Sequence, residues 1–179
     1  IVIGMIVNFI YQYTNRKDTA FNAVLLNASL LDQISSEQPD FITDFAEKEG
    51  IDLNTSDITF DTSIRIVEDS MDEASGTSTQ KLMVYVAANE LDSMITDFNS
   101  FQKYANSSLF YDLRDILTEE QLQALEPYFY YVDREVVLAI EAANDDNYYF
   151  RGDGIVMGIY ANAEHADTAV DLAEYLLSK

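Results

Sequence analysis

The sequence predicts an α/β protein built on a doubly wound, mostly parallel sheet that is flanked by helices. Three observations support this class. Short apolar runs of strand length alternate with amphipathic segments of helix length along residues 18–179. One run alternates strictly between apolar and polar residues, and one helix passes into a strand with almost no loop. Elements in this order need right-handed crossovers and place ligands beyond the carboxyl ends of the strands.

The first strand and the first helix are expected between residues 21 and 50. The run FNAVLLNAS (21–29) is apolar and ends in small polar residues, which is typical of a strand buried on both faces. The next segment, SSEQPDFITDFAEKEGID, predicts a helix with Ser35 or Ser36 as its N-cap. Pro39 is expected in its first turn, and Gly50 is expected to end it.

A strand, a loop, a helix and another strand are expected next. The run SDITFDTSIRIVE (56–68) has a period of two, which predicts a strand with one solvated face near a sheet edge. Residues 68–79 are rich in Ser, Thr and Gly and predict a loop. The run STQKLMVYVAANE (78–90) has a helical stripe, and LDSMITD (91–97) has the length of a strand.

The remaining elements continue the alternation. A helix is expected from Asn99, followed by LFYDLRDIL and by TEEQLQALEPYF, in which Thr118 and Gln121 form a capping box. The run GIVMGIYAN (154–162) predicts an apolar strand. The last segment, ADTAVDLAEYLLSK (166–179), predicts a helix whose apolar side packs onto the domain.

Composition limits the classes of partner. The chain has 179 residues, of which 48% are hydrophobic, so its length suits one domain with a substantial core. Its 32 acidic and 10 basic side chains give a net charge of -22, which opposes binding to nucleic acid or to an anionic lipid surface. Cysteine is absent, which excludes disulfides, thiolate metal sites and cysteine nucleophiles.

The N-terminal run IVIGMIVNFIY is almost wholly apolar but too short to cross a bilayer as a helix. Residues 1–15 are either the outer end of a membrane anchor or an N-terminal helix that packs on its own domain. The polar segment that follows the run, with Tyr11 and Tyr13 at interfacial positions, favours the anchor, although Arg16 and Lys17 oppose it. We therefore expect attachment to the cell membrane, with domain 18–179 on the extracytoplasmic side.

Two segments resemble the family 1 extracellular solute-binding proteins. The run KLMVYVAANELDSMITDFNSFQKYANSSLFYDLRDIL (81–117) is similar to a helix, turn, strand and helix of that family. The tail VMGIYANAEHADTAVDLAEYLLS (156–178) is similar to its late strand and helix, and the likeness extends to membrane-anchored proteins of gut Firmicutes. The resemblance implies one lobe of a periplasmic-binding-type fold. Residues 127–149 are too short for a full second lobe, so we expect a reduced one.

The sequence favours a binding function over an enzymatic one. It contains no GxSxG, HExxH, phosphate-binding-loop or dinucleotide-binding motif. The single histidine, His165, stands at the start of a predicted helix. The chain has no cysteine, and no serine lies in a motif that would pair it with His165 in a catalytic triad. We therefore predict no catalytic residue, no metal site and no cofactor.

The best candidates for a ligand site are polar residues at strand ends and a group of tyrosines, because tyrosine offers a stacking face and a hydroxyl. The candidate ligand-binding residues are Asn27, Ser29, Asp97, Tyr130, Tyr131 and Tyr149. The alternative interpretation of the tyrosines is packing in a core or between lobes. The expected function is to bind a small solute, such as a sugar or an oligopeptide. The rival is a structural or protein-interaction domain that kept the sheet, lost the cleft and binds an envelope protein.

Overall fold

The computed structural model describes residues 16–30, 39–66, 73–105, 109–132, 136–142, 149–152 and 154–178. The expected anchor or helix at residues 1–15, and the expected caps Ser35 and Ser36, lie outside the described residues. Across the described part of the chain, every helix is too short or too polar to span a bilayer.

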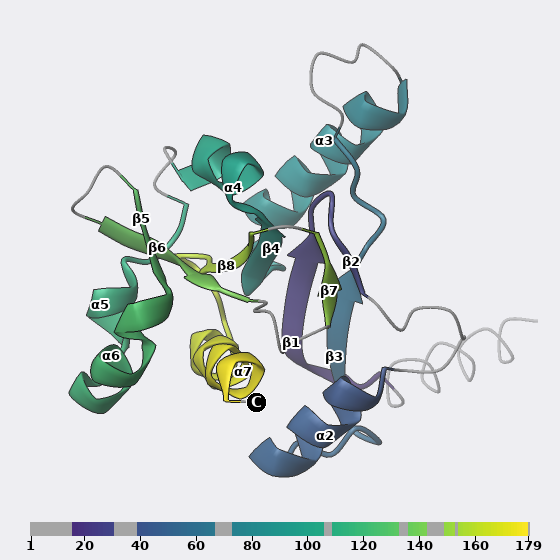
Figure 1. Cartoon of the computed structure of the whole chain (residues 1–179). Helices are drawn as coiled ribbons and strands as arrows, with labels where there is room; N and C mark the ends of the chain where they lie inside the picture. Colours follow the sequence, from purple (N-terminus) through teal and green to yellow (C-terminus); the bar gives the residue numbers. More distant parts are fainter. Residues whose placement is uncertain are drawn as a thin grey trace, which may run out of the picture.

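A six-stranded sheet in the order β3-β1-β4-β8-β6-β5 forms the centre of the fold (Figure 1). Its strands are β1 (Asp18–Leu25), β3 (Ser56–Asp61), β4 (Ser93–Asp97), β5 (Phe129–Val132), β6 (Val136–Glu141) and β8 (Ile155–Ile159). Strand β1 pairs in parallel with β3 and β4, whereas β8 pairs antiparallel with β4 and β6, and β5 antiparallel with β6. The prediction of a mostly parallel sheet is therefore right for one half of the sheet and wrong for the other.

The antiparallel half has a simple cause. Strands β5 and β6 were not expected from the sequence, and only three residues separate Val132 from Val136. A connection of this length can join antiparallel neighbours, whereas parallel neighbours need a crossover of a dozen or more residues. The stretch that is too short for a second lobe thus supplies two more strands to the same sheet.

Helices cover both faces of the sheet. They are α2 (Asp40–Glu49), α3 (Glu73–Ala87), α4 (Phe98–Ala105), α5 (Leu113–Ile116), α6 (Glu119–Leu125) and α7 (Ala166–Leu177), with a 3-10 turn at Glu126–Tyr128. Figure 1 shows α3 and α4 on one side of the sheet and α2 and α7 on the other. Along β1, Ala23 and Leu25 belong to the core under α2 and α7, while Val24 belongs to the core under α3 and α4. Alternate side chains of a strand point to opposite faces, so the sheet separates two cores.

The ends of the elements confirm several local predictions. Gly50 ends α2 in the left-handed conformation with φ 69°. Thr118 and Gln121 form the capping box of α6. Strand β3 lies at the edge of the sheet, as its alternating pattern predicted. Pro39, however, precedes the first turn of α2 and occupies the N-cap position, where it makes no side-chain capping bond.

The predicted loop at residues 68–79 is wrong from Glu73 onward, because α3 begins there. The hydroxyls of Thr77 and Thr79 donate to the carbonyls of Glu73 and Ser75, one helical turn earlier, at 2.8 and 2.9 Å. These bonds occupy the hydroxyls within the helix, so polar composition alone did not prevent helix formation.

A small antiparallel sheet of β2 (Ser29–Leu30) and β7 (Phe150–Arg151) completes the strands. Helix α7 docks through Ala169, Val170 and Leu176, as predicted for the terminal segment. Between α3 and β4 the chain uses residues 88–92, so the connection is longer than the sequence suggested. This connection forms one side of the candidate site.

Candidate functional site

An open groove of about 390 Å³ lies between the α3–β4 connection and the loop that joins β8 to α7. We call it the His165 groove. It is lined by Thr19, Asn22, Ala88, Asn89, Glu90, Asp92, Glu164 and His165. Its volume falls in the range of small-molecule sites, but its lining is largely polar, whereas drug-sized ligand sites are mostly apolar. The groove therefore suits a small and polar ligand.

Asp92 is the buried carboxylate of the groove, with 3% of its surface exposed. One carboxylate oxygen accepts the backbone N–H of Asn22 at 2.8 Å, and the other accepts the backbone N–H of His165 at 2.8 Å. Asp92 also bonds through its own backbone, since its N–H donates to the carbonyl of Asn22 and its carbonyl accepts from Tyr160. These bonds join β1, β4 and the start of α7 at one point.

The same carboxylate orients the imidazole of His165. Nδ1 lies 3.2 and 3.3 Å from the two oxygens of Asp92, and His165 is the N-cap residue of α7, as its position in the sequence predicted. With Nδ1–H donating to Asp92, the neutral ring keeps its lone pair on Nε2. The side chain is 26% exposed, and Nε2 has no hydrogen bond to a described residue. His165 therefore presents an acceptor that is available to a ligand.

Two carboxylates on the rim of the groove are also available. Glu90 and Glu164 are exposed, and neither side chain forms a hydrogen bond or an ion pair with the residues that the structure describes. No lysine or arginine is among the residues that line the groove. The local charge therefore favours ligands with a positive group or with several hydroxyl donors.

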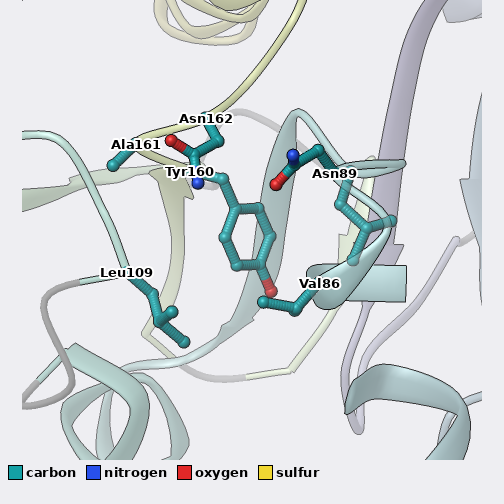
Figure 2. Close-up of a pocket in the computed structure, with 7 residues that line it drawn as sticks. Val86, Asn89, Leu109, Tyr160, Ala161 and Asn162 are labelled. Atoms are coloured by element: carbon teal, nitrogen blue, oxygen red, sulfur yellow. The ribbon is translucent and has the colours of Figure 1, made fainter. Parts of the chain in front are cut away.

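A smaller cavity of about 60 Å³, the Tyr160 notch, adjoins the groove and shares Asn89 with it. It is lined by Val86, Asn89, Leu91, Leu109, Tyr160, Ala161 and Asn162. Figure 2 shows Tyr160 between Leu109 and Asn89, with its hydroxyl directed toward Val86. This hydroxyl has no hydrogen-bond partner in the described part of the chain, and Tyr160 is 4% exposed. Burial, and to a smaller extent the charge of Tyr104, raises the pKa of Tyr160, so its phenol stays protonated.

Asn89 connects the two cavities through an unusual backbone conformation. Its φ is 55°, in the left-handed region, and its N–H donates to the carbonyl of Val86 while the next N–H donates to Tyr85. This is the bonding pattern of a Schellman motif, which ends α3. Asparagine tolerates the left-handed region better than most residues with a side chain. Its amide is thus held at the junction of the groove and the notch.

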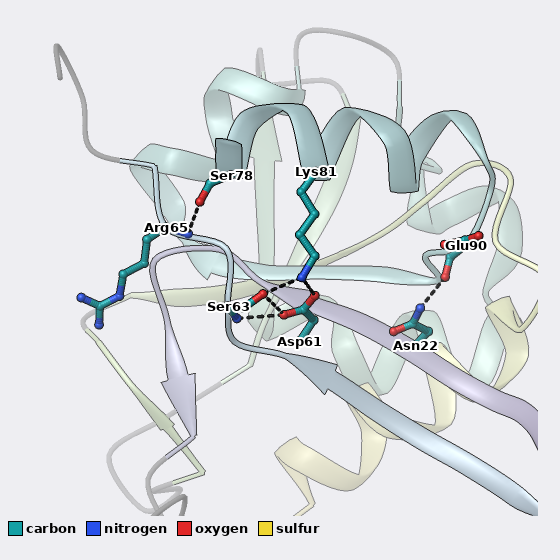
Figure 3. A network of polar contacts seen from close by, with 7 residues as sticks. All are labelled: Asn22, Asp61, Ser63, Arg65, Ser78, Lys81 and Glu90. Atoms are coloured by element: carbon teal, nitrogen blue, oxygen red, sulfur yellow. Dashed lines mark hydrogen bonds and ion pairs between the residues drawn. The ribbon is translucent and has the colours of Figure 1, made fainter. Parts of the chain in front are cut away.

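A second polar cluster joins α3 to β3 and its following turn. Lys81 Nζ donates to Asp61 at 2.7 Å and to the hydroxyl of Ser63 at 2.6 Å (Figure 3). The hydrogen bond to Asp61 raises the pKa of Lys81 against the opposing effect of its burial. Burial raises the pKa of Asp61, but the hydrogen bonds from Lys81 and Ser63 outweigh it and lower the pKa. A lysine held in its charged form cannot remove the proton of Ser63, so the cluster is an ion pair that fixes α3 rather than a catalytic dyad.

The predicted site residues at strand ends take part in hydrogen bonds or strand pairs that hold the fold together. Asn27 joins the end of β1 to Ile66, whose N–H donates to the amide oxygen and whose carbonyl accepts from the amide nitrogen, each at 2.9 Å. Asp97 accepts the N–H of Ser100 at 3.0 Å and so caps the start of α4. Ser29 belongs to β2, opposite Arg151. Asn27 and Asp97 each follow by two positions a partner of the parallel pair of Leu25 and Ile95, so both lie at the same edge of the sheet.

The predicted tyrosines do not gather. The ring of Tyr130 lies 4.7 Å from that of Phe98, in the core under α3 and α4, while Tyr131 is 47% exposed. Tyr149 lies 4.8 Å from Phe41, in the core on the other face of the sheet. This arrangement agrees with the packing interpretation for Tyr130 and Tyr149. None of the six predicted residues lines the groove or the notch.

Sequence reasoning missed the groove itself. The only available signal was His165, a single histidine at the start of a helix, and its partner Asp92 lies 73 positions earlier in the chain. Among the described residues, no group of three or more potential ligands could hold a metal ion. No family model, curated protein or solved structure matches the chain.

Proposed function

We propose that this domain binds a small polar solute in the His165 groove and releases it unchanged. The observation that carries the proposal is the arrangement of Asp92 and His165. A buried carboxylate holds Nδ1 of the imidazole, and the ring it orients lines the groove. A ligand-binding group that is already oriented loses little conformational entropy when the ligand binds.

Binding fits this geometry better than nucleophilic catalysis does. A catalytic triad needs a hydroxyl or thiol within hydrogen-bond reach of the histidine. In the part of the chain that the structure describes, the polar contacts of the His165 imidazole are those to Asp92, and no serine, threonine or tyrosine hydroxyl bonds to it. We therefore assign the pair to recognition.

The cellular setting belongs to the same proposal. The resemblance of residues 81–117 and 156–178 to extracellular solute-binding proteins supports a place outside the cytoplasm, with attachment to the membrane through residues 1–15. The sheet with helices on both faces is compatible with one lobe of a periplasmic-binding-type fold with a reduced second lobe. A net charge of -22 suits a solute-binding surface that repels nucleic acid and anionic lipid.

The experiment is a thermal-shift screen of the whole chain against sugars, amino acids, short peptides and amines. A ligand at a hundredfold excess over its dissociation constant stabilises the folded state by ~2.7 kcal/mol, which corresponds to a rise in Tm of roughly 5–10 °C for a chain of this size. His165→Asn removes the imidazole but keeps a side-chain amide that can bond Asp92 and cap α7, so it should abolish the shift and leave the fold intact.

Asp97→Asn is the matched control. It changes the predicted residue at the opposite edge of the sheet and keeps an oxygen that can cap α4. We expect the ligand shift to survive in this variant. A shift that disappears in Asp97→Asn and persists in His165→Asn would move the binding site to the carboxyl ends of the strands and refute the groove.

A protein-interaction function is the second candidate, favoured by one specific observation. Met83 and Val84, neighbours on α3, are 66% and 62% exposed and so place two large apolar side chains together in solvent. A screen without any thermal shift, together with a change in oligomeric state or partner binding for Met83→Ser with Val84→Ser, would favour this candidate over solute binding.

A further inference from the structure

We infer that the ligand of the groove is a small aliphatic ammonium compound whose far end carries a hydroxyl. This inference rests on the proposed function and specifies its ligand. The positive group would lie among Glu90, Glu164 and His165, and the aliphatic part would pass Asn89 into the Tyr160 notch. The reasons are the charge of the groove, the apolar walls of the notch and the unpartnered hydroxyl of Tyr160.

The positive group follows from the free acceptors of the groove. The carboxylates of Glu90 and Glu164 form no bond with a described residue, and the neutral His165 ring with Nδ1–H on Asp92 would add the lone pair of Nε2. An ammonium group donates three hydrogen bonds and accepts none, which matches a set of acceptors without a competing lysine or arginine. An anionic ligand would meet repulsion from both glutamates.

The aliphatic part follows from the notch. Val86, Leu91 and Leu109 give it apolar walls, and its volume of about 60 Å³ is large enough for a short hydrocarbon chain. Asn89 lines the groove and the notch alike, so the two cavities are neighbours, and the inferred ligand would pass this residue to occupy both. A short hydrocarbon chain would remain in contact with these walls and would exclude water from them.

The terminal hydroxyl follows from Tyr160. Its side chain is 4% exposed, and its hydroxyl has no partner among the described residues. A buried polar group without a partner costs free energy, and most native structures avoid this cost. A ligand hydroxyl at the end of the chain that displaces the side chains shielding the phenol oxygen would donate to it or accept from it, which would satisfy both groups.

The test measures binding by titration calorimetry with four sets of probes. The straight-chain amino alcohols from aminopropanol to aminohexanol are compared with the matching alkylamines, alcohols and hydroxy acids. We expect one amino alcohol to bind best, the matching alkylamine to bind more weakly, and the alcohol and the hydroxy acid to show no binding. Alcohols or hydroxy acids that bind as well as the amine would overturn the inference.

Variants of the protein test the contacts at the two ends of the ligand separately. Glu164→Gln should weaken binding of the amino alcohol by roughly two- to fivefold, within the range of an exposed ion pair. Glu47→Gln removes the same charge from an exposed position on α2 and should leave affinity unchanged. Equal losses in both variants would show that only the overall charge of the protein matters, and would refute a specific ammonium site.

Tyr160→Phe tests the other end. It removes a buried hydroxyl that lacks a partner, so the free protein should keep or raise its Tm. The variant should bind the amino alcohol only as well as wild type binds the alkylamine, and its affinity for the alkylamine should not change. An unchanged preference for the amino alcohol would refute the contact with Tyr160.

Asn89→Gly removes the shared amide without a folding cost, because glycine adopts a φ of 55° more easily than asparagine does. We expect weaker binding of every amine that wild type binds. The proposed function and this inference fail in different ways. A neutral sugar that binds in a manner dependent on His165, with no binding of amines, would keep the function and overturn the ligand class, whereas no binding of any solute would overturn both.

Discussion

Gly158 offers the sharpest test of the packing behind the candidate site. It lies in β8, with Phe101 of α4 directly over its α-carbon. In Gly158→Ala the new methyl would lie 2.3 and 2.6 Å from two ring atoms of Phe101 and 3.0 Å from Phe110. Carbon atoms in contact normally lie ~3.5–4.0 Å apart, so the ring of Phe101 would have to move by roughly 1 Å or more.

Phe101 has little room for this movement. It is fully buried, its ring lies 4.7 Å from that of Phe110, and Phe110 stacks on Tyr160 at 4.7 Å. Overpacking of a buried site costs ~1–3 kcal/mol, and two displaced rings place Gly158→Ala in the upper part of that range. For a domain of this size the expected fall in Tm is roughly 5–10 °C.

Thermal unfolding followed by circular dichroism measures the effect, with urea unfolding as a second measurement. Gly76→Ala is the matched control, because this glycine lies in α3 with nothing within 4 Å of an added methyl. The control should raise stability by up to ~1 kcal/mol through helix propensity. A Tm for Gly158→Ala within about 2 °C of wild type would show that α4 does not pack on β8 as described.

Three further predictions concern local features. Thr118→Ala removes the side-chain acceptor of the α6 capping box and should lower the free energy of unfolding by ~1 kcal/mol in urea, whereas Thr118→Ser should not. Gly50→Ala places a side chain at φ 69° and should cost ~1 kcal/mol in the same assay. The lowered pKa of Asp61 stabilises the fold above the usual pKa of aspartate, and this contribution is lost as the pH falls through the lowered value. The raised pKa of Lys81 also stabilises the fold, and this contribution to the free energy of unfolding is present at lower pH and lost only as the pH rises above ~10.4. The stability difference between wild type and Asp61→Asn should therefore be constant at neutral pH and shrink in acid, and a difference that grows in acid would contradict the ion pair.

Features that depend on neighbouring residues were predictable from the sequence. The capping box of Thr118 and Gln121, the left-handed end of α2 at Gly50, and the alternating edge strand β3 each depend on side chains within a few positions of one another. Hydrophobic periodicity likewise identified the buried strands β1, β4 and β8 and the terminal helix, because burial of an apolar face selects the same period that the sequence displays, although it missed β5 and β6.

Features that depend on distant residues were not predictable in the same way. The polar run that begins α3 resembles a loop in composition, and it is helical because its hydroxyls bond within the helix and Leu82 anchors it to a core. The tyrosines are neighbours in the sequence, yet Tyr130 and Tyr149 pack on opposite faces of the sheet. Closeness in the sequence therefore did not predict closeness in space for these side chains.

The position of the groove follows from the direction of a single strand. In a parallel doubly wound sheet the loops after the strands meet at the carboxyl edge, and the sequence-based candidates Asn27 and Asp97 lie at that edge. Strand β8, however, runs antiparallel to β4, with Ser93 opposite Ile159. The chain that leaves β8 therefore arrives at the amino end of β4, where it brings His165 to Asp92. The reversal of β8 thus moves the convergence of polar loops to the opposite edge of the sheet, which explains why strand-end reasoning selected residues outside the groove.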